Sequence, residues 1–100
     1  MAKPQLAPAA RDDIRDIRHY SKTVFGSRTA IDYIEGLRVS LHRIGEAPLT
    51  GRIESDLGTG LRSAGYRAHR IYYRIDRTPI LIVRILHHAR DIPSAFGPSQ

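Results

Sequence analysis

The chain has 100 residues, of which 41% are hydrophobic and 26% are charged, and its formal net charge is +6. This composition is typical of one globular domain, here residues 1–100, and argues against a disordered chain. There is no cysteine, which excludes disulfides and thiolate metal sites, and the longest aliphatic run, residues 80–83, is far too short to cross a membrane. We therefore expect a cytoplasmic protein without a cofactor or a membrane segment.

The first half of the chain predicts a short strand followed by two helices. Residues 3–7 suit an edge strand, and Pro8 fits the first turn of a helix, where its missing N–H is not needed. Gly26 is expected to end this helix and Ser27 to cap the next one. The apolar face of the first helix is Ala10, Ile14, Ile17 and Tyr20, and that of the second is Ile31, Ile34, Leu37, Leu41 and Ile44. The acidic residues of the first helix, Asp12, Asp13 and Asp16, are interpreted as part of a solvated face.

The second half predicts a loop over residues 46–60 and then three strands. The strands are expected at 61–66, 69–76 and 80–86, with a turn at 76–79 and a flexible tail at 93–100. Because side chains alternate along a strand, Tyr73 is expected in the core, and Tyr72 on the opposite, exposed face. The fold class is therefore α+β, in the order β-α-α-β-β-β. The helical hairpin should cover one face of the antiparallel sheet and leave the other face for a partner.

The positive charge is concentrated in residues 60–90. This segment holds seven arginines against one acid, Asp76, hence +6, which equals the net charge of the chain. Three histidines and three tyrosines lie in the same segment. A cationic sheet with such side chains suits an acidic or phosphate-rich partner.

Several short motifs occur in an order that is typical of one superfamily. They are Phe25-Gly26 with Ala30 and Tyr33, then Pro48 and Gly51, Gly60-Leu61-Arg62, residues 69–74, and residues 84–87 running into Arg90-Asp91. In this order the chain resembles the RelE/ParE superfamily of toxins from bacterial type II toxin–antitoxin systems, and more closely its ParE branch. The resemblance covers almost the whole chain.

The resemblance implies a toxin held in a hetero-oligomer with a cognate ParD-like antitoxin, whose acidic C-terminal tail wraps the toxin. ParE-like toxins are associated with inhibition of DNA gyrase, whereas RelE-like toxins cleave messenger RNA on the ribosome. Cleavage needs proton transfer and stabilisation of the developing phosphorane charge. The chain has only Lys3 and Lys22 as lysines, and Ile92-Pro93 where RelE-like chains tend to place a tyrosine. We therefore favour a gyrase inhibitor that is not an enzyme, and keep a ribosome-dependent endoribonuclease as the alternative.

The candidate functional residues lie on the predicted sheet. The partner-binding candidates are Arg62, Arg70, Tyr72, Arg74, Arg84 and Arg90, and the catalytic candidates of the endoribonuclease alternative are Arg62, His87 and His88. Arg84 interrupts an aliphatic strand, so it needs a buried acid or a partner. His87 and His88 point to opposite sides of a strand, so no metal site is expected. A third hypothesis, resting on charge alone, is a nucleic-acid-binding module.

Overall fold

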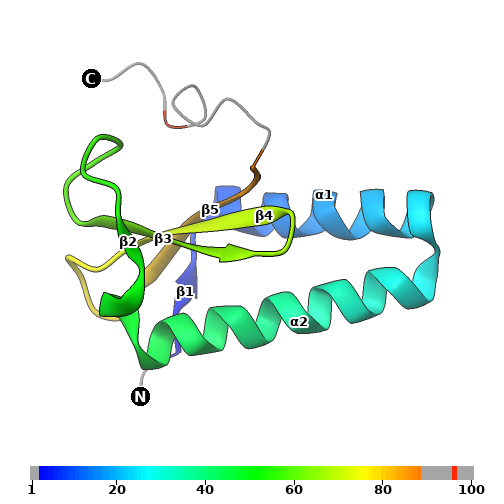
Figure 1. Ribbon diagram of the computed structural model, residues 1–100, viewed down its shortest axis with the longest axis horizontal. Coiled ribbons are helices and arrows are strands. Elements are labelled where there is room, and N and C mark those ends of the chain that lie inside the picture. The colour runs from blue at the N-terminus through cyan, green and yellow to red at the C-terminus, as the bar shows by residue number, and fades with distance from the viewer. Residues whose placement is uncertain (1–2, 89–95, 97–100) are drawn as a thin grey trace.

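The structure is a computed structural model that describes residues 3–88 and residue 96. Its elements in chain order are β1 (Gln5–Leu6), α1 (Pro8–Phe25), α2 (Ser27–Glu46), the 3-10 turn η1 (Pro48–Thr50), β2 (Arg52–Ile53), β3 (Leu61–Tyr66), β4 (His69–Arg74) and β5 (Leu81–His87). The predicted α+β class is confirmed, with five strands in the described residues where four were expected (Figure 1).

Local chemistry explains where the two helices begin and end. Pro8 occupies the first turn of α1, as predicted, and Gly26 separates the helices with a φ of 94°, a conformation that glycine adopts readily. The predicted cap at Ser27 is wrong. Gly26 itself is the N-cap of α2, no side chain caps this helix, and Ser27 is its first residue.

The sheet has the strand order β1-β5-β4-β3-β2. Strands β2 to β5 pair antiparallel, and β1 runs parallel to β5 at the edge, which confirms the predicted edge strand. The expected loop over residues 46–60 is wrong in part, because η1 and β2 lie within it and Arg52 pairs with Ser63. A strand of two residues is too short to leave a periodic signal in the sequence.

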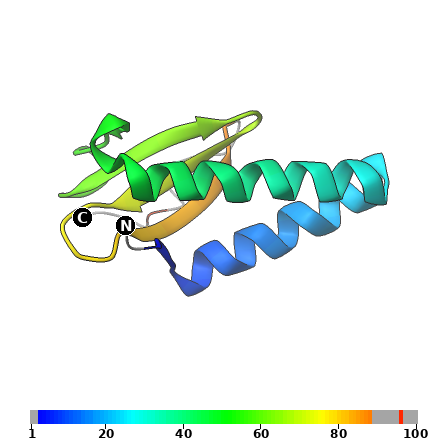
Figure 2. The same ribbon diagram turned by 90° about the horizontal axis from the view of Figure 1, so that it is seen from below.

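The helical hairpin packs against one face of the sheet (Figures 1 and 2). The core between them contains Ala10, Ile17, Ile34, Leu37, Ile44, Ile71, Tyr73, Ile82 and Ile85. The far end of the hairpin projects beyond the sheet, so Tyr20 and Ile31 are 61% and 60% exposed instead of reaching this core. The expected packing of these two residues is therefore wrong, although the other predicted apolar positions face inward.

The opposite face of the sheet, which we call the open face, is defined by the strand register. The strand register pairs Ser63 with Tyr72 and Tyr72 with Arg84. It also pairs Arg70, two residues before Tyr72 on the same strand, with Leu86. These side chains therefore start from the same face of the sheet. A register irregularity lies between Tyr72 and Tyr73. Arg62 pairs with the core residue Tyr73, and therefore belongs to the helix-covered face and not to the open face.

Candidate partner-binding surface

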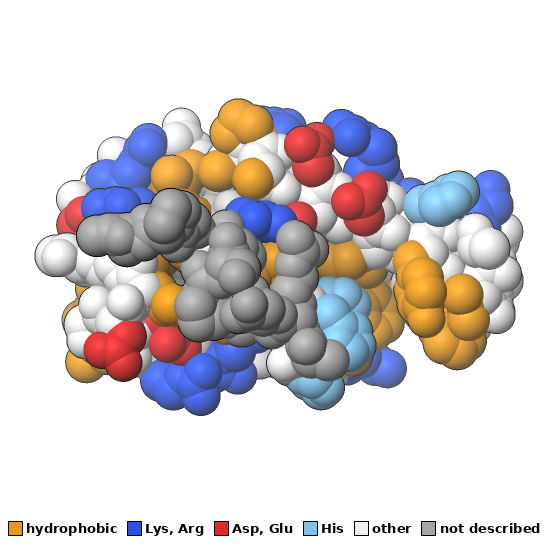
Figure 3. All heavy atoms as spheres, turned by 90° about the horizontal axis from the view of Figure 1, so that it is seen from above, with side chains coloured by type: hydrophobic (Ala, Val, Ile, Leu, Met, Phe, Trp, Pro, Cys, Tyr) orange, Lys and Arg blue, Asp and Glu red, His pale blue; other side chains and the backbone are white. Residues whose placement is uncertain are grey.

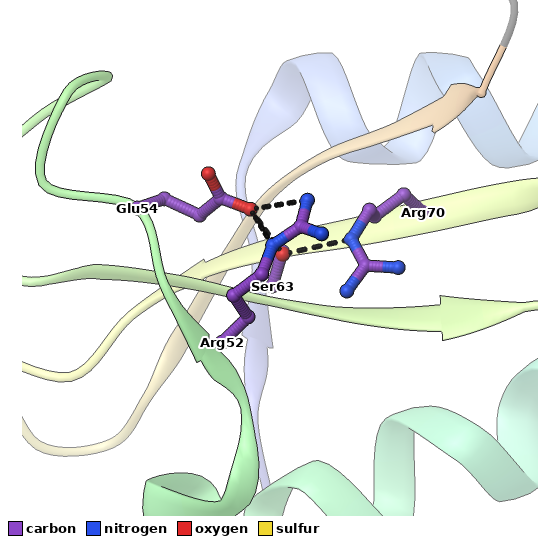
Figure 4. Close-up of polar contacts among 4 residues, drawn as sticks. All are labelled: Arg52, Glu54, Ser63 and Arg70. Carbon is purple, nitrogen blue, oxygen red and sulfur yellow. Dashed lines mark hydrogen bonds and ion pairs between the residues drawn. The ribbon is translucent and has the colours of Figure 1, made fainter.

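Four polar residues form a connected network on the open face (Figure 4). Arg52 and Ser63 both donate to Oε2 of Glu54, at 2.9 Å and 2.6 Å. Arg70 in turn donates from Nε to the Ser63 hydroxyl at 2.9 Å. Strands β2, β3 and β4 and the segment after β2 thus hold two guanidinium groups around one carboxylate.

The carboxyl group of this network is ionised at neutral pH. Partial burial acts to raise the pKa of Glu54, but hydrogen bonds from Ser63 and Arg52 and the positive charges of Arg52 and Arg70 outweigh it, and the pKa is lowered. The network therefore carries two positive charges and one negative charge.

Two of the candidate arginines are already paired with carboxylates of the same chain. Arg74 bonds to Asp76 through Nε and Nη2, and both partners are about 40% exposed. Arg84 bonds to Asp13 of α1 at 2.8 Å and 3.0 Å, and this pair is largely buried. The sequence-based expectation that Arg84 needs a buried acid or a partner is met by an acid within the chain.

Asp13 is not part of a solvated helix face, and that interpretation is corrected. The residue is 8% exposed, and its Oδ2 also accepts the backbone N–H of Ile85 at 2.8 Å. Strand β1 pairs with β5 at Leu81 and Ile82, and no other described strand lies along the edge of β5 beyond them. The carboxylate of Asp13 therefore accepts the hydrogen bond of the Ile85 N–H, which would bond to β1 if that strand were longer.

Arg62 supports the loop before the sheet. Its Nη1 donates to the carbonyl oxygens of Leu49 at 3.1 Å and Gly51 at 2.9 Å, and the hydroxyl of its neighbour Tyr73 donates to the Pro48 carbonyl. These bonds hold η1 against the start of β3. The guanidinium group of Arg62 thus points to backbone carbonyls, away from the other candidate arginines.

Tyr72 differs from the expectation of an exposed side chain. It is 2% exposed, and its ring lies edge-on to that of Phe96 with the ring centroids 5.2 Å apart. A base or partner side chain would have to displace this contact before stacking on Tyr72. Arg90, the last partner-binding candidate, lies outside the described residues.

A second cluster gathers histidines at the end of the sheet where β4 begins and β5 ends. The ring of His69 lies 5.4 Å from that of His87, which lies 4.9 Å from that of His88, and Tyr33 bonds to Nδ1 of His69 at 2.7 Å. Burial, with the neighbouring imidazoles of His87 and His88, lowers the pKa of His69. Within the described residues, no group of three His, Cys, Asp or Glu side chains is arranged to hold a metal ion.

The structure does not bring the endoribonuclease candidates together. Arg62 pairs with Tyr73, and His87 pairs with His69, four residues away along β4. At about 3.3 Å per residue the two backbone positions are about 13 Å apart along the strand, and the guanidinium group of Arg62 donates to the carbonyls of Leu49 and Gly51. Glu54, Ser63 and Asp13 were missed as site residues, because only tertiary structure shows that they contact arginines.

The basic and acidic residues of the helical hairpin nearly balance, seven against six, but some of its basic side chains have no described carboxylate beside them. In the described part of the chain, Arg18, Lys22 and Arg38 have no ion pair, and they surround a groove of about 510 Å³ over Ala30 and Ile31. Figure 3 shows basic side chains interspersed with acidic ones on one face, and hydrophobic side chains clustered at the end where the hairpin turns. No helix of the described residues is long and apolar enough to span a bilayer.

Comparison with known proteins gives one consistent result. A family model described as the ParE toxin of the type II toxin–antitoxin system parDE matches residues 5–92. A curated relative, Toxin ParE3 of Caulobacter vibrioides, is 28% identical over 72 residues, which is 72% of either chain. A solved structure described as a chromosomal ParDE TA system from P. aeruginosa has a TM-score of 0.71 and 16% identity, and the match covers 85% of this chain and 96% of that one. At this identity the structural likeness supports the fold alone.

Proposed function

Because the chain belongs to the ParE toxin family of type II toxin–antitoxin systems, we propose that it arrests growth by inhibiting DNA gyrase and is neutralised by a ParD-like antitoxin with an acidic C-terminal tail. The family match over residues 5–92 carries the proposal. Membership of this family implies an antitoxin partner, and the net charge of +6 favours an acidic one. Both partners act in the cytoplasm, where the proposal also places the toxin.

The antitoxin tail is proposed to lie across the open face. Arg70 offers guanidinium donors there, and the exposed pair of Arg74 and Asp76 can exchange its carboxylate for one of the partner at small cost. Arg84 contributes differently, because its bond to the buried Asp13 fixes the β5 edge. Arg62, Tyr72 and Arg90 remain proposed contacts of the antitoxin or of gyrase.

A supercoiling assay tests the gyrase proposal. Purified toxin in molar excess is added to gyrase, ATP and relaxed plasmid, and we expect supercoiled product to decrease with toxin concentration. Prior incubation of the toxin with the protein encoded beside its gene should restore the activity. Unchanged supercoiling at excess folded toxin would remove gyrase as the target.

The network around Glu54 favours a second candidate function, the ribosome-dependent endoribonuclease. Glu54 is an ionised carboxylate between Arg52 and Arg70, so it could accept the proton of a 2′-hydroxyl while a guanidinium group stabilises the phosphorane. The 2′-oxygen then bonds to phosphorus as the bond to the 5′-oxygen breaks, and the departing 5′-oxygen takes a proton from water. Toeprinting on translating ribosomes tests this role. Codon-specific cleavage that Glu54→Gln abolishes would support it, and the absence of cleavage by the wild-type toxin would discard it.

A further inference from the structure

Arg70 is fixed on the open face by its neighbours. Its Nε donates to Oγ of Ser63, which is 1% exposed. Because the Ser63 hydroxyl donates its own proton to Glu54 at 2.6 Å, its lone pairs are available to Arg70. Gly65, which pairs with Arg70 across the strands, has no side chain, and a Cβ there would lie 3.1 Å from Nη1 of Arg70. The guanidinium group is thereby oriented before any ligand arrives (Figure 4).

The outer edge of this guanidinium group is available for a ligand. In the part of the chain that the structure describes, the bond from Nε is the only hydrogen bond of the Arg70 side chain, and Nη1 and Nη2 have no acceptor. Two parallel N–H donors match the two oxygens of a carboxylate or phosphate. Arg52, in contrast, uses Nε and Nη2 on Glu54.

The charge of the network selects among such ligands. Arg52 and Arg70 against Glu54 leave a net charge of +1, which one carboxylate neutralises. An RNA strand carries a negative charge on every nucleotide, so it would bring further phosphates toward the Glu54 carboxylate. The Arg70 side chain starts opposite Leu86, which is already buried within the chain, and its guanidinium group lies beside Gly65, which has no side chain to obstruct a ligand. An extended peptide that presents one carboxylate suits this position.

We propose that Arg70, oriented by Ser63 and Glu54, is a receptor for a single carboxylate side chain of an extended acidic peptide, supplied by the antitoxin tail. This inference rests on the proposed function for the source of the peptide, but not for the chemistry of the site. Glu54 has two roles in it. It orients Arg70 through Ser63, and it repels a second acidic side chain placed beside the first.

The site can be tested directly on the full-length protein by following the Arg70 Nε–Hε resonance in NMR titrations. The probes are a capped Leu-Ser-Glu-Ser-Leu peptide with one carboxylate, its counterpart with Gln in place of Glu, and a uridine octanucleotide. We expect the Glu peptide to shift the Arg70 resonance saturably, and to bind about tenfold or more tightly than the Gln peptide. The octanucleotide should not saturate this resonance.

Three variants separate the site from general electrostatics. Arg70→Lys keeps the charge but loses the paired donors, and Ser63→Ala loses the bond that orients Arg70. Both variants should therefore weaken binding of the Glu peptide by about fivefold or more. In these variants binding is followed through the backbone amides of neighbouring residues. Arg38→Lys, an exposed change on the hairpin, should leave it unchanged. Backbone amide spectra of every variant report whether the fold is intact.

Other results would overturn the proposal. Equal affinity for the Glu and Gln peptides, or equal affinity of wild type and Arg70→Lys, would show that Arg70 is no carboxylate receptor. Saturation by the octanucleotide alone would reassign the site to RNA. A toxin that inhibits gyrase but fails this titration keeps the proposed function and loses the site, whereas the reverse result keeps the site and loses gyrase as the target.

Discussion

Replacing Asp13 should destabilise the protein strongly, because this carboxylate joins α1 to the edge of the sheet. Asp13→Ala removes the acceptor of two bonds from Arg84 and one from the backbone of Ile85, all between 2.8 and 3.0 Å. The change leaves a largely buried guanidinium group and an edge N–H without these partners. Breaking a buried pair in this way costs about 3–5 kcal/mol, which is a large part of the roughly 5–15 kcal/mol that stabilises a typical domain.

Urea denaturation followed by far-UV circular dichroism measures this cost. Asp13→Asn should lose less than Asp13→Ala, because its one side-chain oxygen can still accept from Ile85 and from Nε of Arg84, whereas the ionic attraction and the bond from Nη2 are lost. The neighbouring Asp12→Ala is the control, since Asp12 forms an exposed pair with Arg15, and its loss should cost less than about 0.5 kcal/mol. If Asp13→Ala and Asp12→Ala lowered the free energy of unfolding equally, the role of Asp13 at the β5 edge would be refuted.

Single contacts elsewhere in the fold lead to three more predictions. The pKa of His69 lies below its unfolded value of 6.5, so its contribution to stability is present above that pH and is lost as the pH falls. Urea denaturation should therefore show a free energy of unfolding that decreases from about pH 7.5 to about pH 5.5, and His69→Gln should reduce this decrease. An equal decrease in both proteins would contradict this. A Gly-to-Ala change inside a helix normally stabilises it, but the new Cβ of Gly36→Ala would lie 2.1 Å from the Tyr66 hydroxyl. We therefore expect the free energy of unfolding to fall by about 1–3 kcal/mol, and a rise would be evidence against the close contact. Arg62→Met removes two bonds to loop carbonyls and should speed hydrogen exchange of the backbone around η1, with unchanged exchange counting against this support role.

Much of the fold is predictable because the long elements are periodic. The strand predicted at 61–66 is observed as Leu61–Tyr66, and the break at Gly26 separates two helices as expected. Strand β2 was missed because its pairing with β3, and not its own sequence, makes it a strand. The exposed ends of the hairpin were misjudged because the stripes continue along both helices beyond the edge of the sheet that could cover them.

The candidate site was less predictable, since a side chain's partner depends on the tertiary structure. Asp12 and Asp13 are adjacent and chemically identical, yet one is exposed and the other is buried against Arg84. The position of Arg84 within an aliphatic strand predicts that it needs a partner, but the sequence does not identify that partner. Glu54 lies in a segment without periodicity, and only the pairing of β2 with β3 brings it to Ser63.

The topology of a reporter plasmid, extracted from cells after the toxin is induced, tests the proposed function most directly. Inhibition of gyrase predicts that negatively supercoiled plasmid is lost before growth stops, and that co-expression of the antitoxin prevents both effects. Growth arrest with the plasmid still fully supercoiled would contradict the account and direct attention to the ribosome.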